Sequence, residues 1–71
     1  MDVVSVGVIG VGRWGRNIVR VIKSSSSMDL VAICDVDIDR AKSVAKEYRV
    51  QKVFSDYREL LDLRDIDAVI I

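Results

Sequence analysis

The fold is decided by the stretch Val6-Gly7-Val8-Ile9-Gly10-Val11-Gly12-Arg13-Trp14-Gly15. Residues 3–9 form a short, nearly continuous apolar run, which is typical of a strand buried on both faces in a parallel sheet. Three glycines follow at once with the spacing G-x-G-x-x-G. Residues 13–23 then carry an apolar face at helical spacing, made up of Trp14, Ile18, Val21 and Ile22. The stretch predicts a strand, a tight turn and a helix in direct succession.

The same alternation continues into the middle of the chain. Residues 30–34 form a second apolar run, which ends at Asp35. Asp37 suits the start of a second helix, because its carboxylate can accept hydrogen bonds from the free N–H groups there. The apolar face of that helix consists of Ala41, Val44, Ala45 and Tyr48. A second strand and a second helix are therefore expected.

The last third of the chain predicts three short elements. Residues 51–54 are a third strand, and residues 67–71 begin a fourth. Between them, Ser55 or Asp56 can cap a short third helix, and Asp56 with Glu59 fits the spacing of a capping box. The apolar side of this helix consists of Leu60 and Leu61.

Alternating strands and helices of this kind form a parallel sheet with helices on its faces. We expect an α/β fold with about four parallel strands in the order 3-2-1-4 and helices on both faces, which is a partial Rossmann fold. The length of 71 residues allows one small domain, residues 1–71, of marginal stability.

Composition excludes several classes of function. Eleven basic residues balance eleven acidic ones, so no basic surface is expected to attract nucleic acid or an anionic membrane. With Cys34 as the single cysteine and no histidine, a zinc site is not expected. No apolar run approaches the ~20 residues that span a bilayer, and the N-terminus has no signal-peptide pattern. We expect a soluble, cytoplasmic protein.

The glycine-rich turn carries the chemistry. Gly10 lets the chain turn out of the strand, Gly12 leaves room for a pyrophosphate beside the backbone, and Gly15 lets the helix pack against the strand. The helix start, with Val11, Arg13 and Trp14 around it, presents free N–H groups and a partial positive charge to phosphate. Asp35 comes 20 positions after Gly15, the spacing of the acid that binds the ribose in dinucleotide sites. Together they predict a dinucleotide-binding site.

The acid also indicates which dinucleotide. A carboxylate at position 35 repels a 2′-phosphate, so NAD is favoured over NADP, although Arg40 lies close enough in sequence to weaken that preference. Other readings remain open for single residues. Asp35 is alternatively a solvated strand end, and the arginines of the first helix are alternatively solvated. Trp14 is expected to pack over the turn or against a partner outside these residues rather than on the nicotinamide, and Cys34 is expected in the core.

These residues resemble the N-terminal part of the Gfo/Idh/MocA oxidoreductases, the family of glucose–fructose oxidoreductase and inositol dehydrogenase. The resemblance covers essentially the whole chain. It is carried by residues 6–17, 30–35, 39–41, 54–61 and 66–71. The Trp-Gly-x-Asn form of the turn resembles branches that act on sugars and sugar nucleotides.

The resemblance implies an NAD(P)-dependent oxidoreductase that transfers hydride on a sugar, polyol or sugar nucleotide. It carries over only the cofactor-binding positions, and it assigns no catalytic residue here, because the family's Glu-Lys-Pro motif and substrate domain are not among these residues. We therefore expect the 71 residues to be the N-terminal part of the dinucleotide-binding domain and inactive alone. The uncovered edge of the fourth strand, from Ala68 to Ile71, is expected to drive self-association.

Two other classes of protein share part of this pattern. A non-catalytic nucleotide-sensing module, like the regulatory Rossmann domains of potassium-uptake systems, also pairs a glycine-rich turn with an acid. Such modules usually have a Gly-Asp-Ala-Thr-like segment after the third strand, where this sequence has Phe54-Ser55-Asp56-Tyr57. A methyltransferase needs a different glycine spacing. The oxidoreductase reading is favoured over both.

Overall fold

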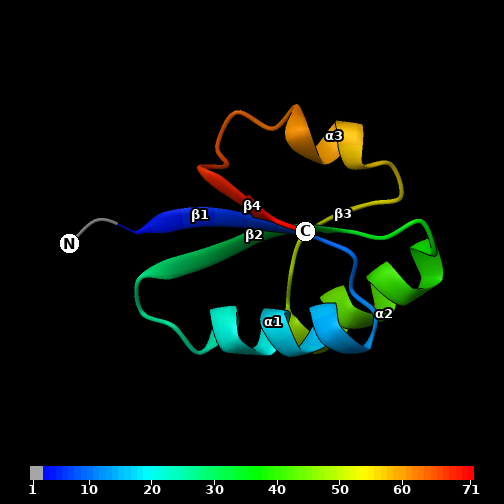
Figure 1. The fold of residues 1–71 in the computed structure, drawn as a ribbon, viewed down its shortest axis with the longest axis horizontal. Helices are drawn as coiled ribbons and strands as arrows, with labels where there is room; N and C mark the ends of the chain where they lie inside the picture. Colours follow the sequence, from blue (N-terminus) through cyan, green and yellow to red (C-terminus); the bar gives the residue numbers. More distant parts are fainter. Residues whose placement is uncertain (1–2) are drawn as a thin grey trace.

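A computed structural model describes residues 3–71 and contains the expected alternation of strands and helices (Figure 1). The elements are β1 (Val4–Ile9), α1 (Arg13–Lys23), β2 (Met28–Cys34), α2 (Ile38–Tyr48), β3 (Lys52–Phe54), α3 (Tyr57–Leu61) and β4 (Ala68–Ile70). In the described part of the chain, no helix has the length and apolar character needed to cross a membrane.

The four strands form one parallel sheet in the order β3-β2-β1-β4, as predicted. Val8 of β1 lies opposite Ile33 of β2 on one side and Ile70 of β4 on the other. Helices α1 and α2 cover one face of the sheet, and α3 covers the other (Figure 1). The partial Rossmann fold expected from the sequence is confirmed.

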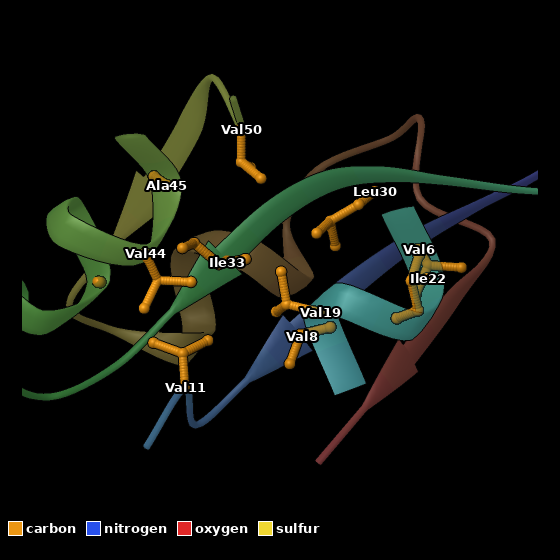
Figure 2. Close-up of a cluster of buried hydrophobic side chains, with 11 residues drawn as sticks. Val6, Val8, Val11, Val19, Ile22, Leu30, Ile33, Val44, Ala45 and Val50 are labelled. Carbon is orange, nitrogen blue, oxygen red and sulfur yellow. The ribbon is translucent and has the colours of Figure 1, made fainter. Parts of the chain in front are cut away.

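The core is divided between the two faces of the sheet. The larger cluster lies between the sheet and the pair α1 and α2 (Figure 2), and it contains Val6, Val8, Val11, Val19, Ile22, Leu30, Ile33, Ala41, Val44, Ala45 and Val50. The smaller cluster lies under α3 and contains Ala32, Cys34 and Leu60. Neighbouring residues of β2 fall into different clusters because successive side chains of a strand point to opposite faces. Each fully buried aliphatic side chain stabilises the fold by about 1.5–3 kcal/mol.

Helix α1 has the predicted bounds but buries a different face. Its buried residues are Gly15, Val19 and Ile22, and Ile18 packs against them. Trp14, which the periodicity assigned to the apolar face, is largely exposed, and Val21, assigned to the same face, is half exposed. The prediction failed there because the inner face passes through Gly15, a residue without a side chain that pattern reading does not count as apolar.

Strand β2 begins at Met28, two residues before the predicted start. The added residues include Asp29, which lies opposite Ser5 in the sheet while its own side chain is exposed. Strand pairing uses the backbone, so a polar side chain that points to solvent does not end it. The other three strands start one residue later than predicted.

Helix α3 is capped by Asp56, and the alternative cap Ser55 is not used. The Asp56 side chain accepts a hydrogen bond from the backbone N–H of Arg58 at 3.0 Å. The reciprocal bond of a capping box, in which the Glu59 carboxylate accepts from the backbone N–H of Asp56, does not occur among the hydrogen bonds of residues 3–71. Leu60 is fully buried, but Leu61 is half exposed, contrary to expectation. Consecutive helical residues point about 100° apart, so a helix of five residues directs only one of the two leucines at the sheet.

Candidate functional site

The predicted site residues converge at the carboxyl ends of the strands, where ligands bind in open α/β sheets. The turn between β1 and α1 forms one wall of a cavity of about 380 Å³, here called the turn cavity. Asp35, which follows β2, and Ile70 at the end of β4 also line it. Residues from three separate segments thus meet in one place.

Gly10 and Gly15 shape the turn for different reasons. Gly10 has a φ of +89°, in the left-handed region that residues with a side chain rarely adopt. A Cβ atom added to Gly15 would lie 1.7 Å from the carbonyl oxygen of Gly10. Both glycines are therefore required by the protein itself.

Gly12 is a different case. A Cβ atom at this position would meet only the Arg40 guanidinium, with 3.4 Å to its Nη1. The missing side chain leaves open space in the turn cavity, beside the backbone. Gly12 is therefore not required by packing, and the room it leaves is available to a ligand.

Helix α1 begins at this turn without a side-chain cap. Gly12 is its N-cap residue, and the first turn contains no acidic residue. By contrast, α2 and α3 are each capped by an aspartate, Asp37 and Asp56, whose side chain accepts from a backbone N–H. The free N–H groups at the start of α1 and its partial positive charge thus remain available to an anion.

Asp35 is buried, with 6% of its surface exposed, so it is not a solvated strand end. Its Oδ2 accepts a hydrogen bond from the backbone N–H of Val11 at 3.0 Å, and its Oδ1 accepts one from that of Asp37 at 2.9 Å. Because an ionised carboxylate has about four acceptor positions, two remain for a ligand. The carboxylate therefore fastens the glycine turn to the end of β2 and can still bind a hydroxyl.

Three arginines surround the outer side of the turn. Arg13, Arg16 and Arg40, with Val11 and Gly12, line a second cavity of about 320 Å³, here called the arginine cavity. The Arg40 Nη1 atom lies 3.7 Å from Asp35 Oδ2. Within residues 3–71, neither Arg13 nor Arg16 pairs with a carboxylate. The guanidinium groups add positive charge to the uncapped helix start.

The side chains of two turn residues, Val11 and Trp14, contribute less to the site than the sequence suggests. The side chain of Val11 belongs to the buried core, so only its backbone faces the site. Trp14 lines the turn cavity but is 77% exposed, so its indole does not pack over the turn, and the other expectation, packing against a partner outside these residues, stays a prediction.

A third cavity lies on the other side of β2 and was not predicted from the sequence. It measures about 160 Å³ and is lined by Ile9, Gly10, Cys34, Asp35, Val36, Ser55 and Tyr57. We call it the apolar cavity. Val36, Ser55 and Tyr57 follow the carboxyl ends of β2 and β3, and this position is the signal that would have found them.

Cys34 is a core residue, as predicted. It is free and buried, and burial raises the pKa of its thiol, with the carboxylates of Asp35, Asp56 and Glu59 adding to the effect. The thiol therefore stays protonated near neutral pH and contributes a small apolar surface.

The comparisons with known proteins identify the family. Residues 4–71 match the model of the Gfo/Idh/MocA family, described as an oxidoreductase family with an NAD-binding Rossmann fold. The chain is 42% identical over 65 residues to the uncharacterized oxidoreductase YrbE of Bacillus subtilis, covering 92% of this chain and 19% of that protein.

Solved structures agree with this assignment. Myo-inositol dehydrogenase from Lactobacillus casei, in complex with NAD(H) and myo-inositol, superposes with a TM-score of 0.90 at 35% identity, covering 97% of this chain and 21% of that one. A 3-ketoreductase from Actinomadura kijaniata, in complex with TDP-benzene and NADP, gives a TM-score of 0.85 at 28% identity, covering 96% of this chain and 22% of that one.

The chain spans about a fifth of the length of the curated relatives that it matches. The alternative of a nucleotide-sensing module finds no support in these comparisons. The chain belongs to the Gfo/Idh/MocA family of oxidoreductases, and residues 4–71 match the NAD-binding Rossmann fold of that family.

Proposed function

We propose that the turn cavity holds the ADP-ribose part of NAD. The observation that carries this proposal is the convergence of an uncapped helix start, a turn without side chains at Gly12 and a buried carboxylate at Asp35. Backbone N–H groups from Gly12 to Gly15 donate to the pyrophosphate, and Asp35 accepts from the ribose hydroxyls. Gly10 holds the turn in shape.

The other turn residues have supporting roles in this proposal. Val11 contributes backbone only, since its N–H is held by Asp35 and its side chain lies in the core. Arg13 lies at the helix start and adds positive charge beside the pyrophosphate. Trp14 offers an exposed apolar surface to the turn cavity, which Ile70 and Ile71 also line.

We propose that NAD is preferred over NADP, although Arg40 makes the preference moderate. A 2′-phosphate on the ribose would approach the Asp35 carboxylate, which repels it. Arg40, 3.7 Å from that carboxylate, offsets part of the repulsion. We therefore expect NADP to bind more weakly than NAD but not to be excluded.

We also propose that residues 1–71 act as the N-terminal part of a longer cofactor-binding unit in an enzyme that oxidises a sugar or polyol. The likeness to a dehydrogenase bound to myo-inositol supports this substrate class. NAD accepts the hydride in such reactions. The groups that move a proton at the reacting carbon are expected outside these residues, because the family's Glu-Lys-Pro motif is not among them.

Calorimetric titration of the 71-residue chain with NAD, NADP and ADP-ribose tests the proposal. We expect binding of NAD and ADP-ribose, and weaker binding of NADP. In an Asp35→Asn variant the preference for NAD over NADP should shrink, whereas Asp39→Asn, a matched exposed acid in α2, should leave it unchanged. No detectable heat at millimolar NAD would overturn the proposed function.

We further propose that the chain self-associates through β4. In the described sheet, β4 pairs only with β1, so its outer edge presents free backbone groups. Light scattering over a range of concentrations tests this, and Val69→Lys should reduce the association. A constant monomeric mass at high concentration would contradict it.

A further inference from the structure

Helix α1 separates its charges from its less buried apolar side chains. Because successive helical residues point about 100° apart, its four basic residues all fall on one side of the buried face. These are Arg13, Arg16, Arg20 and Lys23. Three apolar residues fall on the other side, here called the apolar flank, and they are Trp14, Ile18 and Val21. The apolar flank carries no charge although much of it is in contact with solvent.

The apolar flank faces over β4. Trp14 and Ile18 line the turn cavity together with Ile70 at the end of that strand. The basic side of the helix faces α2, because Arg16 lines the arginine cavity together with Arg40. Charged residues are depleted at the centre of protein interfaces, so an exposed helix flank without charge indicates a surface that another chain covers.

The two edges of the sheet differ in the same way. In the described sheet β3 and β4 each pair with one strand only, so both have an outer edge. β3 contains Lys52, whose Nζ lies 3.2 Å from Asp65 Oδ2, and a lysine on an edge strand discourages pairing with another chain. β4 consists of Ala68, Val69 and Ile70 and carries no charge. The uncharged edge lies next to the apolar flank, so a single partner can cover both.

We propose that this partner is a second copy of the chain, whose β4 pairs antiparallel with the first about a two-fold axis at Val69. The inference rests on the proposed self-association and gives its geometry. A two-fold contact uses the same surface on both copies, and here it joins two four-stranded sheets into one. Pairing centred on Val69 places the partner's Ala68 opposite Ile70. No like charges oppose each other, because neither β4 nor the apolar flank is charged.

The side chains on the α1 face of β4 suit this arrangement. Ile70 packs on the larger core cluster, and Ala68, two residues earlier in the strand, points to the same face. The partner strand lies about 4.8 Å beyond β4, under the overhanging flank. Trp14 lies at the carboxyl end of β4, where the antiparallel partner presents its small Ala68. Because α1 runs antiparallel to the strands, Val21 lies toward the amino end, where the partner presents its larger Ile70.

Cysteine cross-linking tests the orientation of the two strands. Directly opposite residues of antiparallel strands have Cα atoms about 4.5–5.5 Å apart, which a disulfide can span. We expect oxidation of a mixture of Ala68→Cys and Ile70→Cys chains to give a cross-linked dimer. Each variant alone is the control and should remain uncross-linked, since its own cysteines lie on opposite sides of the axis. The native Cys34 is buried and does not compete.

A second measurement tests the apolar flank. Trp14 is the only tryptophan of the chain and is 77% exposed, so its fluorescence should shift to shorter wavelength as rising concentration drives association. Val21→Lys adds a charge to the flank and should weaken self-association by about tenfold. Leu61→Lys is the matched control, because Leu61 is 53% exposed against 49% for Val21 but lies on α3, on the other face of the sheet (Figure 1). Circular dichroism confirms that each variant keeps its helices.

The outcomes separate the inference from the proposal on which it rests. If light scattering gives a monomeric mass at every concentration, the proposed self-association fails and the inference fails with it. If the chain associates but the cysteine mixture gives no cross-link, or Val21→Lys associates as strongly as the parent chain, only the inference fails. A mass that grows beyond two copies also overturns it, because a two-fold axis closes at the dimer.

Discussion

Gly12 and Gly15 are three residues apart in one turn, and the missing side chain has a different effect at each position. Gly15 makes room for the protein, since its backbone lies against the carbonyl of Gly10. Gly12 makes room for the ligand, since only the Arg40 side chain lies near its missing Cβ. Substitution of each by alanine should therefore separate stability from binding.

We predict that Gly15→Ala destabilises the fold by about 1–3 kcal/mol, because its methyl group overlaps the Gly10 carbonyl. Helix propensity alone predicts the reverse sign, a gain of up to about 1 kcal/mol for alanine in a helix. Gly12→Ala should change the free energy of unfolding by less than about 0.5 kcal/mol and weaken NAD binding. Urea unfolding and calorimetry measure the two effects. An equal loss of stability in both variants would contradict this assignment.

The Cys34 thiol provides a second prediction at this scale. Burial raises its pKa above the ordinary value of 9.0, so little thiolate forms near pH 8. Iodoacetamide should therefore modify the native chain much more slowly than the urea-unfolded chain. The stability that comes from keeping the thiol neutral is present below the unfolded pKa and is lost as the pH rises through the raised folded pKa. Equal rates of modification in the native and unfolded chain would count against a buried thiol.

At the scale of elements, α1 shows where pattern reading succeeds and where it stops. The residues predict the helix and its bounds, because apolar residues recur at helical spacing after a glycine turn. They do not predict its rotation about its axis. The buried face includes Gly15, and only the contact of that residue with the Gly10 backbone reveals which side faces the sheet.

A pair of valines on α1 tests this rotation. Val19 is fully buried and Val21 is half exposed. We expect Val19→Ala to lower the free energy of unfolding by about 1–3 kcal/mol and Val21→Ala by less than about 0.5 kcal/mol. The same urea titration measures both. A larger loss of unfolding free energy for Val21→Ala than for Val19→Ala would show that α1 buries the face expected from the periodicity.

We expect the contribution of the Asp56 cap to the stability of α3 to be lost in acid. Hydrogen bonds from the Arg58 side chain, and then from its backbone N–H, lower the pKa of Asp56 below the ordinary 3.8. The carboxylate therefore stabilises the fold at higher pH, and this contribution is lost as the pH falls through the lowered folded pKa. Asn can still cap a helix but carries no charge. The difference in urea midpoint between the parent chain and Asp56→Asn should shrink between about pH 6 and about pH 2. If the difference in urea midpoint does not change with pH, the charge of Asp56 beside Arg58 contributes nothing to stability.

At the scale of the whole molecule, the fold is small and its core is split by the sheet. A chain of this size buries only about 60% of the surface that it exposes when unfolded, so its stability is low. A ligand that contacts both the glycine turn and Asp35 at the end of β2 adds interactions between these two segments of the folded chain. Binding should therefore be visible in the stability of the entire chain.

We predict that NAD at 100 times its Kd raises the free energy of unfolding by about 2.7 kcal/mol. Thermal unfolding followed by circular dichroism measures the shift in Tm. NADP at the same concentration should give a smaller shift. A Tm that does not respond to NAD would contradict binding to the folded chain.

The sequence predicts the order of elements, the strand order and the position of the phosphate turn, because each depends on local pattern and on the general rules of parallel sheets. It does not predict the contacts that join distant segments. The hydrogen bond from Val11 to Asp35 spans 24 residues, and the apolar cavity brings Val36 and Tyr57 together. Both depend on how α3 and the loops pack, which no local pattern encodes.

The bond between Asp35 and the turn has a consequence for the evolution of this protein. One carboxylate holds the Val11 N–H and is also the proposed receptor for the ribose. A substitution that admits a 2′-phosphate would also release the turn from β2. A change of cofactor in this lineage therefore requires two coordinated substitutions, one at position 35 and one that restrains the turn by another route. Few mutational routes meet both requirements, so proteins descended from this sequence are expected to keep the same dinucleotide preference.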